Sequence, residues 1–336
     1  MTSGAPSLEL CVGTVGTSVW FSGDLGETWT RPYTESGLYL EAGVWSLLGD
    51  ETGHGRVLAG SNEGLYEWAP GVGRWSRLPS PLGMGTVWAI ARSPANADRL
   101  IAGRRPAALM SSDNGGFDWA SIDVEFARDC VYVGTPRVTQ ICFDPMRSGR
   151  VWASVEIDGV YRSDDDGLSW RKCDGAGLVS EDVHGVMAIV ADGRTRLFAT
   201  TNKGLHVSED GGDTWTLRLL DSPWQYTRAI VRQATPGGTL FLTNGNGPPG
   251  STGRLMRSED VGLTWFDAGL PATLNSTPWC VAVHPSAPDV VIVATNLGQL
   301  FRSSDGGNSW EKLEREFGEI RALLLHPKRV ERLRTA

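Results

Sequence analysis

The stretch Ser303–Trp310 reads Ser-Ser-Asp-Gly-Gly-Asn-Ser-Trp, and its pattern, Ser-x-Asp-x-Gly-x-Ser/Thr-Trp, decides the fold because the chain repeats it. Complete copies of the pattern occur at Ser22–Trp29, Ser163–Trp170, Ser208–Trp215 and Ser258–Trp265. A weakened copy, Ser112–Trp119, has Asn114 in place of the aspartate. A seventh copy has lost almost everything except its tryptophan, Trp75.

The seven tryptophans that close these copies lie 46, 44, 51, 45, 50 and 45 residues apart. A period of that length is typical of propeller blades, each a sheet of four strands. The Asp and Gly of each copy favour a tight turn between two antiparallel strands, and the Trp can bury its ring beneath that turn. The repeat therefore predicts an all-β, seven-bladed β-propeller.

The copies resemble the Asp-box repeats, also called BNR repeats, of sialidases, sortilin-type propellers, xyloglucanases and photosystem assembly propellers. The resemblance covers nearly the whole chain. It implies a propeller, and it implies that the repeats lie on the outer rim, away from any ligand. Sialidases have six blades and an Arg-Ile-Pro motif, for which Arg31-Pro32 and Arg105-Pro106 are poor matches. Their activity is therefore not carried over.

The innermost strand of each blade is expected at a short apolar run. These runs are Val44–Leu48, Val87–Ala91, Val138–Phe143, Gly185–Val190, Arg228–Val231, Trp279–Val283 and Ile320–Leu325. The last run has no repeat after it, and the N-terminal segment has a repeat but no innermost strand before it. We therefore expect Ile320–Leu325 to pair with Leu8–Gly13, which closes the ring within one domain spanning residues 1–336 and leaves no open sheet edge.

Composition excludes several classes of function. With 31 Lys and Arg against 39 Asp and Glu, the net charge is −8, so nucleic-acid and anionic-membrane partners are not expected. No apolar stretch is long enough for a membrane helix, and Met1 to Leu10 lacks the features of a signal peptide. Five cysteines without a Cys-x-x-Cys pair are expected to be free thiols in a reducing, cytoplasmic setting. No spacing of ligands is diagnostic of a metal, and neither a metal nor another cofactor is expected.

Aligning the seven innermost strands by the turns that follow them predicts which side chains meet on the axis. The first inward position gives Trp45, Trp88, Thr139, Val186, Arg228, Trp279 and Arg321, and the position two residues earlier gives Gly43, Thr86, Arg137, His184, Tyr226, Thr277 and Glu319. The alignment can slip by one residue where the turn lacks proline, as it does after His184. Among the residues of the adjoining loops, Glu156, Asp158 and Asp182 are available to orient that histidine.

Two classes of function fit this ring. In the first, a hydrolase or lyase acts on a small anionic or ring-bearing substrate. Arg137, Arg228 and Arg321 receive the anion, because a guanidinium fork suits carboxylates, phosphates and sulfates. Trp45, Trp88 and Trp279 stack the ring of the substrate, and His184, Tyr226 and Glu319 transfer protons.

In the second class, a non-catalytic binding or assembly propeller presents the same face to a protein or peptide. An axis lined by polar residues around water, with tryptophans that only fill space, is the plain structural alternative to both. The oligomeric state and the substrate are left open by the sequence.

Overall fold

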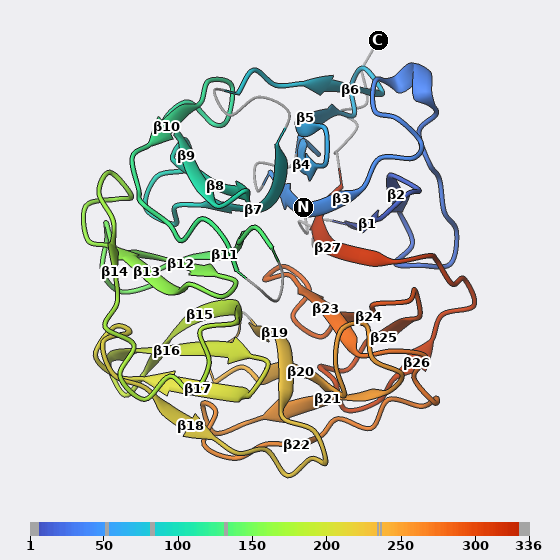
Figure 1. Cartoon of the computed structure of the whole chain (residues 1–336). Coiled ribbons are helices and arrows are strands. Elements are labelled where there is room, and N and C mark those ends of the chain that lie inside the picture. Colours follow the sequence, from blue (N-terminus) through green and yellow to red (C-terminus); the bar gives the residue numbers. More distant parts are fainter. Residues whose placement is uncertain are drawn as a thin grey trace, which may run out of the picture.

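The computed structural model describes residues 7–50, 54–80, 85–130, 134–233, 235 and 237–328. These residues form seven antiparallel sheets around a central axis, which Figure 1 views end on. The chain is all-β, apart from one short 3-10 helix, η1 (Thr34–Ser36). The predicted seven-bladed β-propeller is confirmed.

Six of the sheets have four strands, and in each the chain runs from the axis to the rim. In that direction they are β3 (Val44–Gly49), β4 (Val57–Ser61), β5 (Gly64–Ala69) and β6 (Arg74–Arg77); β7 (Thr86–Arg92), β8 (Leu100–Arg105), β9 (Ala108–Ser112) and β10 (Ala120–Ile122); β11 (Val138–Phe143), β12 (Val151–Val155), β13 (Gly159–Ser163) and β14 (Arg171–Lys172); β15 (Val183–Ala191), β16 (Arg194–Thr201), β17 (Gly204–Ser208) and β18 (Thr216–Arg218); β19 (Tyr226–Arg232), β20 (Leu240–Gly245), β21 (Gly253–Ser258) and β22 (Phe266–Asp267); β23 (Pro278–Val283), β24 (Val291–Thr295), β25 (Leu300–Ser303) and β26 (Glu311–Lys312).

The seventh sheet joins the two ends of the chain. Its innermost strand is β27 (Ile320–Pro327), followed by β1 (Leu8–Thr14) and β2 (Val19–Ser22). Leu10 lies opposite Leu325 in the antiparallel pairing of β1 with β27, as the sequence predicted. The expected fourth strand is reduced to a single bridge between Phe21 and Thr30. We call this sheet the closure blade.

The repeated motif forms the same turn in each complete copy, between the third strand of a blade and its rim. In the copy Ser303–Trp310, the Ser303 hydroxyl donates to Asp305 at 2.8 Å and accepts from the Gly307 amide at 2.8 Å. Asp305 also accepts from the amide and hydroxyl of Ser309. Gly307 has φ +89°, and a Cβ there would meet the Phe241 ring at 2.5 Å, so the position requires glycine.

These hydrogen bonds make the aspartates of the turns strongly acidic. The bonds from Ser309 and Ser303 lower the pKa of Asp305 to about 2. In Asp165, Asp210 and Asp260 slight burial acts to raise the pKa, but the hydroxyl and amide four residues later outweigh it and leave each pKa at about 2. We call these four residues the turn aspartates.

The weakened and degenerate copies behave differently from each other. In the weakened copy, Asn114 bonds Asp118 at 2.8 Å, and the Gly116 amide still donates to the Ser112 hydroxyl. In the degenerate copy, Trp75 is only 2% exposed and lies 5.4 Å from the ring of Trp68. Loss of the motif has therefore not loosened the packing of its tryptophan.

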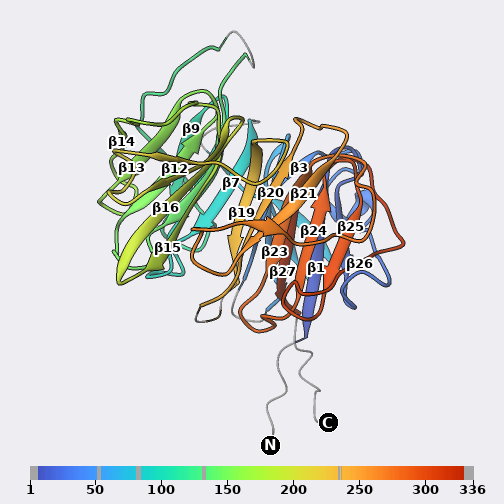
Figure 2. The same cartoon turned by 90° about the horizontal axis from the view of Figure 1, so that it is seen from below.

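Figure 2 shows that β1 begins and β27 ends at one face of the molecule, while the described part of the loop between β10 and β11 projects from the opposite face. The innermost strands begin at this second face, which we call the mouth. In the described part of the chain, no helix is long and apolar enough to cross a membrane. All five cysteines are free thiols.

Candidate functional site

All seven innermost strands carry an irregularity near the mouth. Where each pairs with its neighbour, the register shifts, so that one or two residues of the inner strand have no direct partner. The residues skipped in this way include Trp45, Trp88, Thr139, His184, Arg228, Trp279 and Arg321. All seven line one cavity on the axis, and we call them the axial ring. A β-bulge re-aims side chains in this way and is common beside functional sites.

The axial ring confirms six of the seven inward positions expected from the sequence and corrects the seventh. Val186 was expected on the axis, but it is fully buried inside its blade, packed with Val183 and Leu197. His184 takes the position instead. The bulge between Val183 and Gly185 moves the inward position two residues toward the mouth, and no proline marks the turn that follows.

Six side chains at the axis form a continuous stack of aromatic rings and guanidinium groups. Trp45 and Trp88 are stacked with centroids 4.2 Å apart. Arg137 lies 3.9 Å from the Trp88 ring, and Arg321 lies 5.2 Å from the Trp45 ring. Arg321 also lies 4.6 Å from Trp279, whose ring is 4.1 Å from Arg228.

The stack thus brings together all three arginines and all three tryptophans that the sequence singled out. Each tryptophan already has two stacking neighbours within it. Cation–π contacts of this kind hold the guanidinium planes in fixed orientations.

The three arginines differ in their charge partners. Arg137 forms an ion pair with Glu156, and Arg321 forms one with Glu319. Burial lowers the pKa of Arg137 to about 10 and also lowers that of Arg321, and the charge of Arg228 adds to both effects. Arg228 is 9% exposed, and no carboxylate of the described residues lies within 4.0 Å of its guanidinium. It is the one arginine of the stack without a counter-ion.

His184 is held by one hydrogen bond and lies beside one carboxylate. Its Nδ1–H donates to the Thr227 carbonyl at 2.6 Å, and its Nε2 lies 3.4 Å from Asp182 Oδ1. Burial and the charge of Arg228 lower the pKa of His184 more than Asp182 raises it. The Tyr226 ring lies 4.8 Å from the imidazole, and burial raises the pKa of its hydroxyl.

The three residues expected to transfer protons are only partly brought together. His184 and Tyr226 are in contact, but the carboxylate of Glu319, just before β27, is paired with Arg321 two residues further along the chain. Across the described residues, no hydrogen bond or ion pair joins Glu319 to either of the other two. The acids beside His184 and Tyr226 are Asp182 and Glu156, which face each other in an isolated antiparallel bridge.

Several polar atoms near the ring are buried without a hydrogen-bond partner in the described structure. They are Glu156 Oε2, Arg137 Nε, Arg321 Nε and the indole nitrogens of Trp45 and Trp88. For Asp182 burial acts to raise the pKa, but His184 and the charges of Arg228 and Arg137 outweigh it and leave the pKa lowered. Asp158, the other acid available from the loops, instead binds Tyr161 and Lys172. Sequence reasoning placed Glu156 and Asp182 only among loop residues, because neither lies in an apolar strand pattern.

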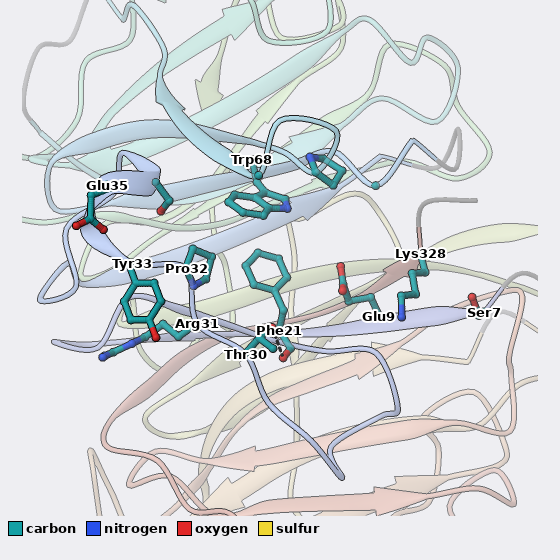
Figure 3. A pocket seen from close by; sticks show the side chains of 14 residues that line it. Ser7, Glu9, Phe21, Thr30, Arg31, Pro32, Tyr33, Glu35, Trp68 and Lys328 are labelled. Carbon is teal, nitrogen blue, oxygen red and sulfur yellow. Dashed lines mark hydrogen bonds between the residues drawn. The ribbon is translucent and has the colours of Figure 1, made fainter. Parts of the chain in front are cut away.

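The axial cavity has a volume of about 230 Å³ and extends from the ring along the following residues of the inner strands, such as Ala229–Val231. A larger hollow of about 1060 Å³ lies elsewhere, between the closure blade and the blade of β3 to β6. Figure 3 shows Phe21, Trp68, Pro32 and Tyr33 around this second hollow. We call it the closure groove. It contains none of the residues predicted for the site.

Comparison with curated proteins finds two kinds of relative. Xyloglucanase Xgh74A of Acetivibrio thermocellus is 23% identical over 315 residues, which are 78% of this chain and 37% of the relative. Photosystem II assembly lipoprotein Ycf48 of a Synechococcus strain is 30% identical over 112 residues, 33% of this chain and 31% of the relative. The chain thus spans about a third of the length of these relatives. No family model matches the chain.

Solved structures give the same two groups. The GH74 xyloglucanase of Xanthomonas campestris matches with a TM-score of 0.63 at 22% identity, over 80% of this chain and 45% of that protein. YCF48 bound to D1 peptide matches with a TM-score of 0.56 at 16% identity, over 85% of this chain and 93% of that protein. The suspected kinship in fold with xyloglucanase-type and assembly-factor-type propellers is confirmed. At these identities the likeness establishes the fold alone.

Proposed function

We propose that the axial ring binds a small anion, or the anionic group of a larger ligand, through the guanidinium of Arg228. The observation that carries this proposal is the unequal pairing of the three arginines. Glu156 and Glu319 neutralise Arg137 and Arg321, whereas Arg228 is buried without a carboxylate of the described residues within ion-pair distance. Burying an uncompensated charge costs several kcal/mol, which a bound anion offsets.

The surroundings of Arg228 favour an anion over other ligands. The charge of Arg228 lowers the pKa of both Arg137 and Arg321, so the three guanidinium groups lie close enough to act on one ligand. Contact with Trp279 fixes the guanidinium plane, so the fork is preorganised for two parallel hydrogen bonds to a carboxylate, phosphate or sulfate. The stacking neighbours of the three tryptophans are all members of the ring. We therefore propose the anionic group, rather than a stacked ring, as the feature that the site recognises.

The cavity volume of about 230 Å³ limits what can enter completely. It holds a small ion or acid, or the end group of a chain that continues out of the cavity. A carboxylate could come from a metabolite or from an acidic peptide, and the protein with a bound D1 peptide among the solved neighbours makes the second source worth testing.

Isothermal titration calorimetry tests this proposal. Sulfate, phosphate, a small dicarboxylate and a short acidic peptide are the titrants, and Arg228→Gln is the variant. Losing the charge-assisted bonds, worth about 1.5–3 kcal/mol, should weaken binding roughly 10- to 100-fold. Arg257→Gln is the control, because Arg257 pairs with Glu259 at the rim. Equal heats from wild type and Arg228→Gln would refute the site, and a response to the peptide alone would identify the assembly-type role.

Hydrolysis is a second candidate, and the pair Glu156 and Asp182 favours it. Glu156 Oε2 is buried without a hydrogen-bond partner in the described residues, Asp182 Oδ1 lies 3.4 Å from His184 Nε2, and burial raises the pKa of the Tyr226 hydroxyl beside them. Glu156 and Asp182 are partners in a backbone bridge, and a pair of carboxyl groups is the usual equipment of glycoside hydrolases. Xyloglucanases are among the relatives of this chain. We propose hydrolysis rather than elimination for this reason.

Release of reducing ends from xyloglucan oligosaccharides and from aryl glycosides tests the hydrolytic role. Glu156→Gln and Asp182→Asn should each abolish turnover, while Asp158→Asn, at the acid bound to Tyr161 and Lys172, should retain it. Wild type without turnover on any of these substrates would remove the hydrolytic candidate. The anion site would remain to be judged by calorimetry alone.

A further inference from the structure

A cluster of three metal-binding side chains lies on the closure blade, away from the axial ring. Glu9 and Cys11 are two residues apart on β1 and therefore point to the same side of the sheet. His326, on β27, lies directly opposite Glu9 in the pairing of the two strands. The cluster thus takes two ligands from one end of the chain and one from the other.

The donor atoms of this cluster converge on one point. Cys11 Sγ and Glu9 Oε2 each lie 3.4 Å from the same atom, His326 Nε2. Zinc bonds of about 2.3 Å to sulfur and 2.1 Å to nitrogen or oxygen, at the tetrahedral angle, put sulfur about 3.6 Å and oxygen about 3.4 Å from nitrogen. The spacing therefore matches zinc coordination before any ion is added.

Hydrogen bonding alone gives a poor account of the same arrangement. A single N–H at Nε2 cannot point well at both the thiol and the carboxylate. His326 is 0% exposed. Cys11 is equally buried, in a cluster with Val44 and Ala59. Polar groups left like this in an apolar core are costly, and a shared cation compensates them.

The closure groove gives the cluster a route to solvent. Glu9 lines this groove of about 1060 Å³, and Figure 3 shows it at the end of the groove near Ser7 and Lys328. An ion can therefore reach the carboxylate from solvent, and water in the groove can occupy a fourth position. Zinc sites with three protein ligands and one open position have this form.

We propose that Glu9, Cys11 and His326 bind one zinc ion, which fastens β1 to β27 and so closes the propeller. The sequence predicted no metal, because the ligands are separated by 315 residues between Cys11 and His326 and show no diagnostic spacing. Binding draws the two chain ends together, so its free energy adds to the stability of the folded ring. Cys11 loses its thiol proton on binding, which makes the affinity fall as pH is lowered.

Cobalt substitution tests this site on the full chain. The metal-free protein, prepared with a chelator, is titrated with Co²⁺ and followed by absorption spectroscopy. One equivalent should produce the thiolate-to-cobalt charge-transfer band and the strong d–d bands of a tetrahedral site. Zn²⁺ should then abolish both and raise the melting temperature. No charge-transfer band in wild type would overturn the proposal.

Matched variants assign the ligands. Cys11→Ser should abolish the charge-transfer band, while Cys173→Ser, a buried thiol in another blade, should leave it unchanged. Glu9→Gln preserves shape at the partly exposed ligand and should weaken zinc affinity by at least the ~10–100-fold that outer-shell substitutions cause. It keeps the test valid if Cys11→Ser fails to fold. A band retained in Cys11→Ser, or zinc affinity unchanged in Glu9→Gln, would refute the assignment.

Discussion

Replacing Trp75 and Trp310 by alanine distinguishes the contribution of burial to stability from the contribution of the hydrogen bonds in the turn. Trp75 belongs to the degenerate copy, yet it is 2% exposed and packs against Trp68 and Phe21. Trp310 closes a complete copy, but it is only partly buried, its indole nitrogen has no partner in the described structure, and its aromatic neighbour Phe241 is 6.0 Å away. The sequence alone predicts the larger loss at Trp310, and the structure predicts the opposite.

The expected sizes follow from this packing. Truncating a fully buried tryptophan costs about 3–5 kcal/mol, and Trp75 should lie at the upper end because each aromatic pair adds about 0.5–1.5 kcal/mol. Trp310→Ala should cost about 2–3 kcal/mol, since part of its surface stays in water and its N–H bond is missing. Equilibrium urea unfolding followed by circular dichroism measures both. If Trp310→Ala lowers the free energy of unfolding by as much as Trp75→Ala or more, the hydrogen-bonded turn, and not burial, determines how much each tryptophan stabilises the protein.

Three further predictions concern closure, acid stability and the pH dependence of the axial site. Removing residues 319–336 deletes β27 and exposes the edge of β1, so the protein should aggregate. A truncated protein that melts within a few degrees of the full chain would show that the pairing of β27 with β1 is not needed for stability. The turn aspartates have lowered pKa values, so they stabilise the folded protein fully above the unfolded pKa of about 3.9 and lose this effect as pH falls through about 2. The free energy of unfolding, measured as a function of pH, should fall most steeply in that window. A free energy of unfolding that stays constant there would contradict this prediction. Because the pKa of His184 is lowered, the affinity for the anion should rise only as pH falls below about 6.5, where the imidazole gains a positive charge beside Arg228. Calorimetry at several pH values measures this rise, and His184→Gln should abolish it.

The sequence predicted the architecture well because the repeat supplies its own internal alignment. All seven innermost strands lie where the apolar runs placed them, and the pairing of β27 with β1 followed from counting strands against repeats. The fourth strand of the closure blade was expected in full, but the chain after Phe21 makes only one bridge, at Thr30. Nothing in the local composition marks that shortening.

The site was predicted less completely, for two physical reasons. A bulge adds a residue without changing composition, so the inward position at His184 could not be separated from Val186 by a period-two pattern. His184, Tyr226 and Glu319 were grouped by their expected positions on the axis, and this criterion ignores ion pairs between residues close together in the chain. Glu319 and Arg321 are two residues apart and neutralise each other, a signal that was present in the sequence. Neighbours across blades, such as Glu156 and Asp182, emerge only from the fold.

The most direct test of the account is the location of a bound anion on the propeller axis. Crystals soaked in selenate and measured at the selenium absorption edge reveal the ion by its anomalous scattering. We predict a peak within hydrogen-bonding distance of the Arg228 guanidinium, beside Trp279, and no such peak in crystals of Arg228→Gln. Selenate found only on the outer surface, with no peak on the axis of the wild-type protein, would contradict this prediction.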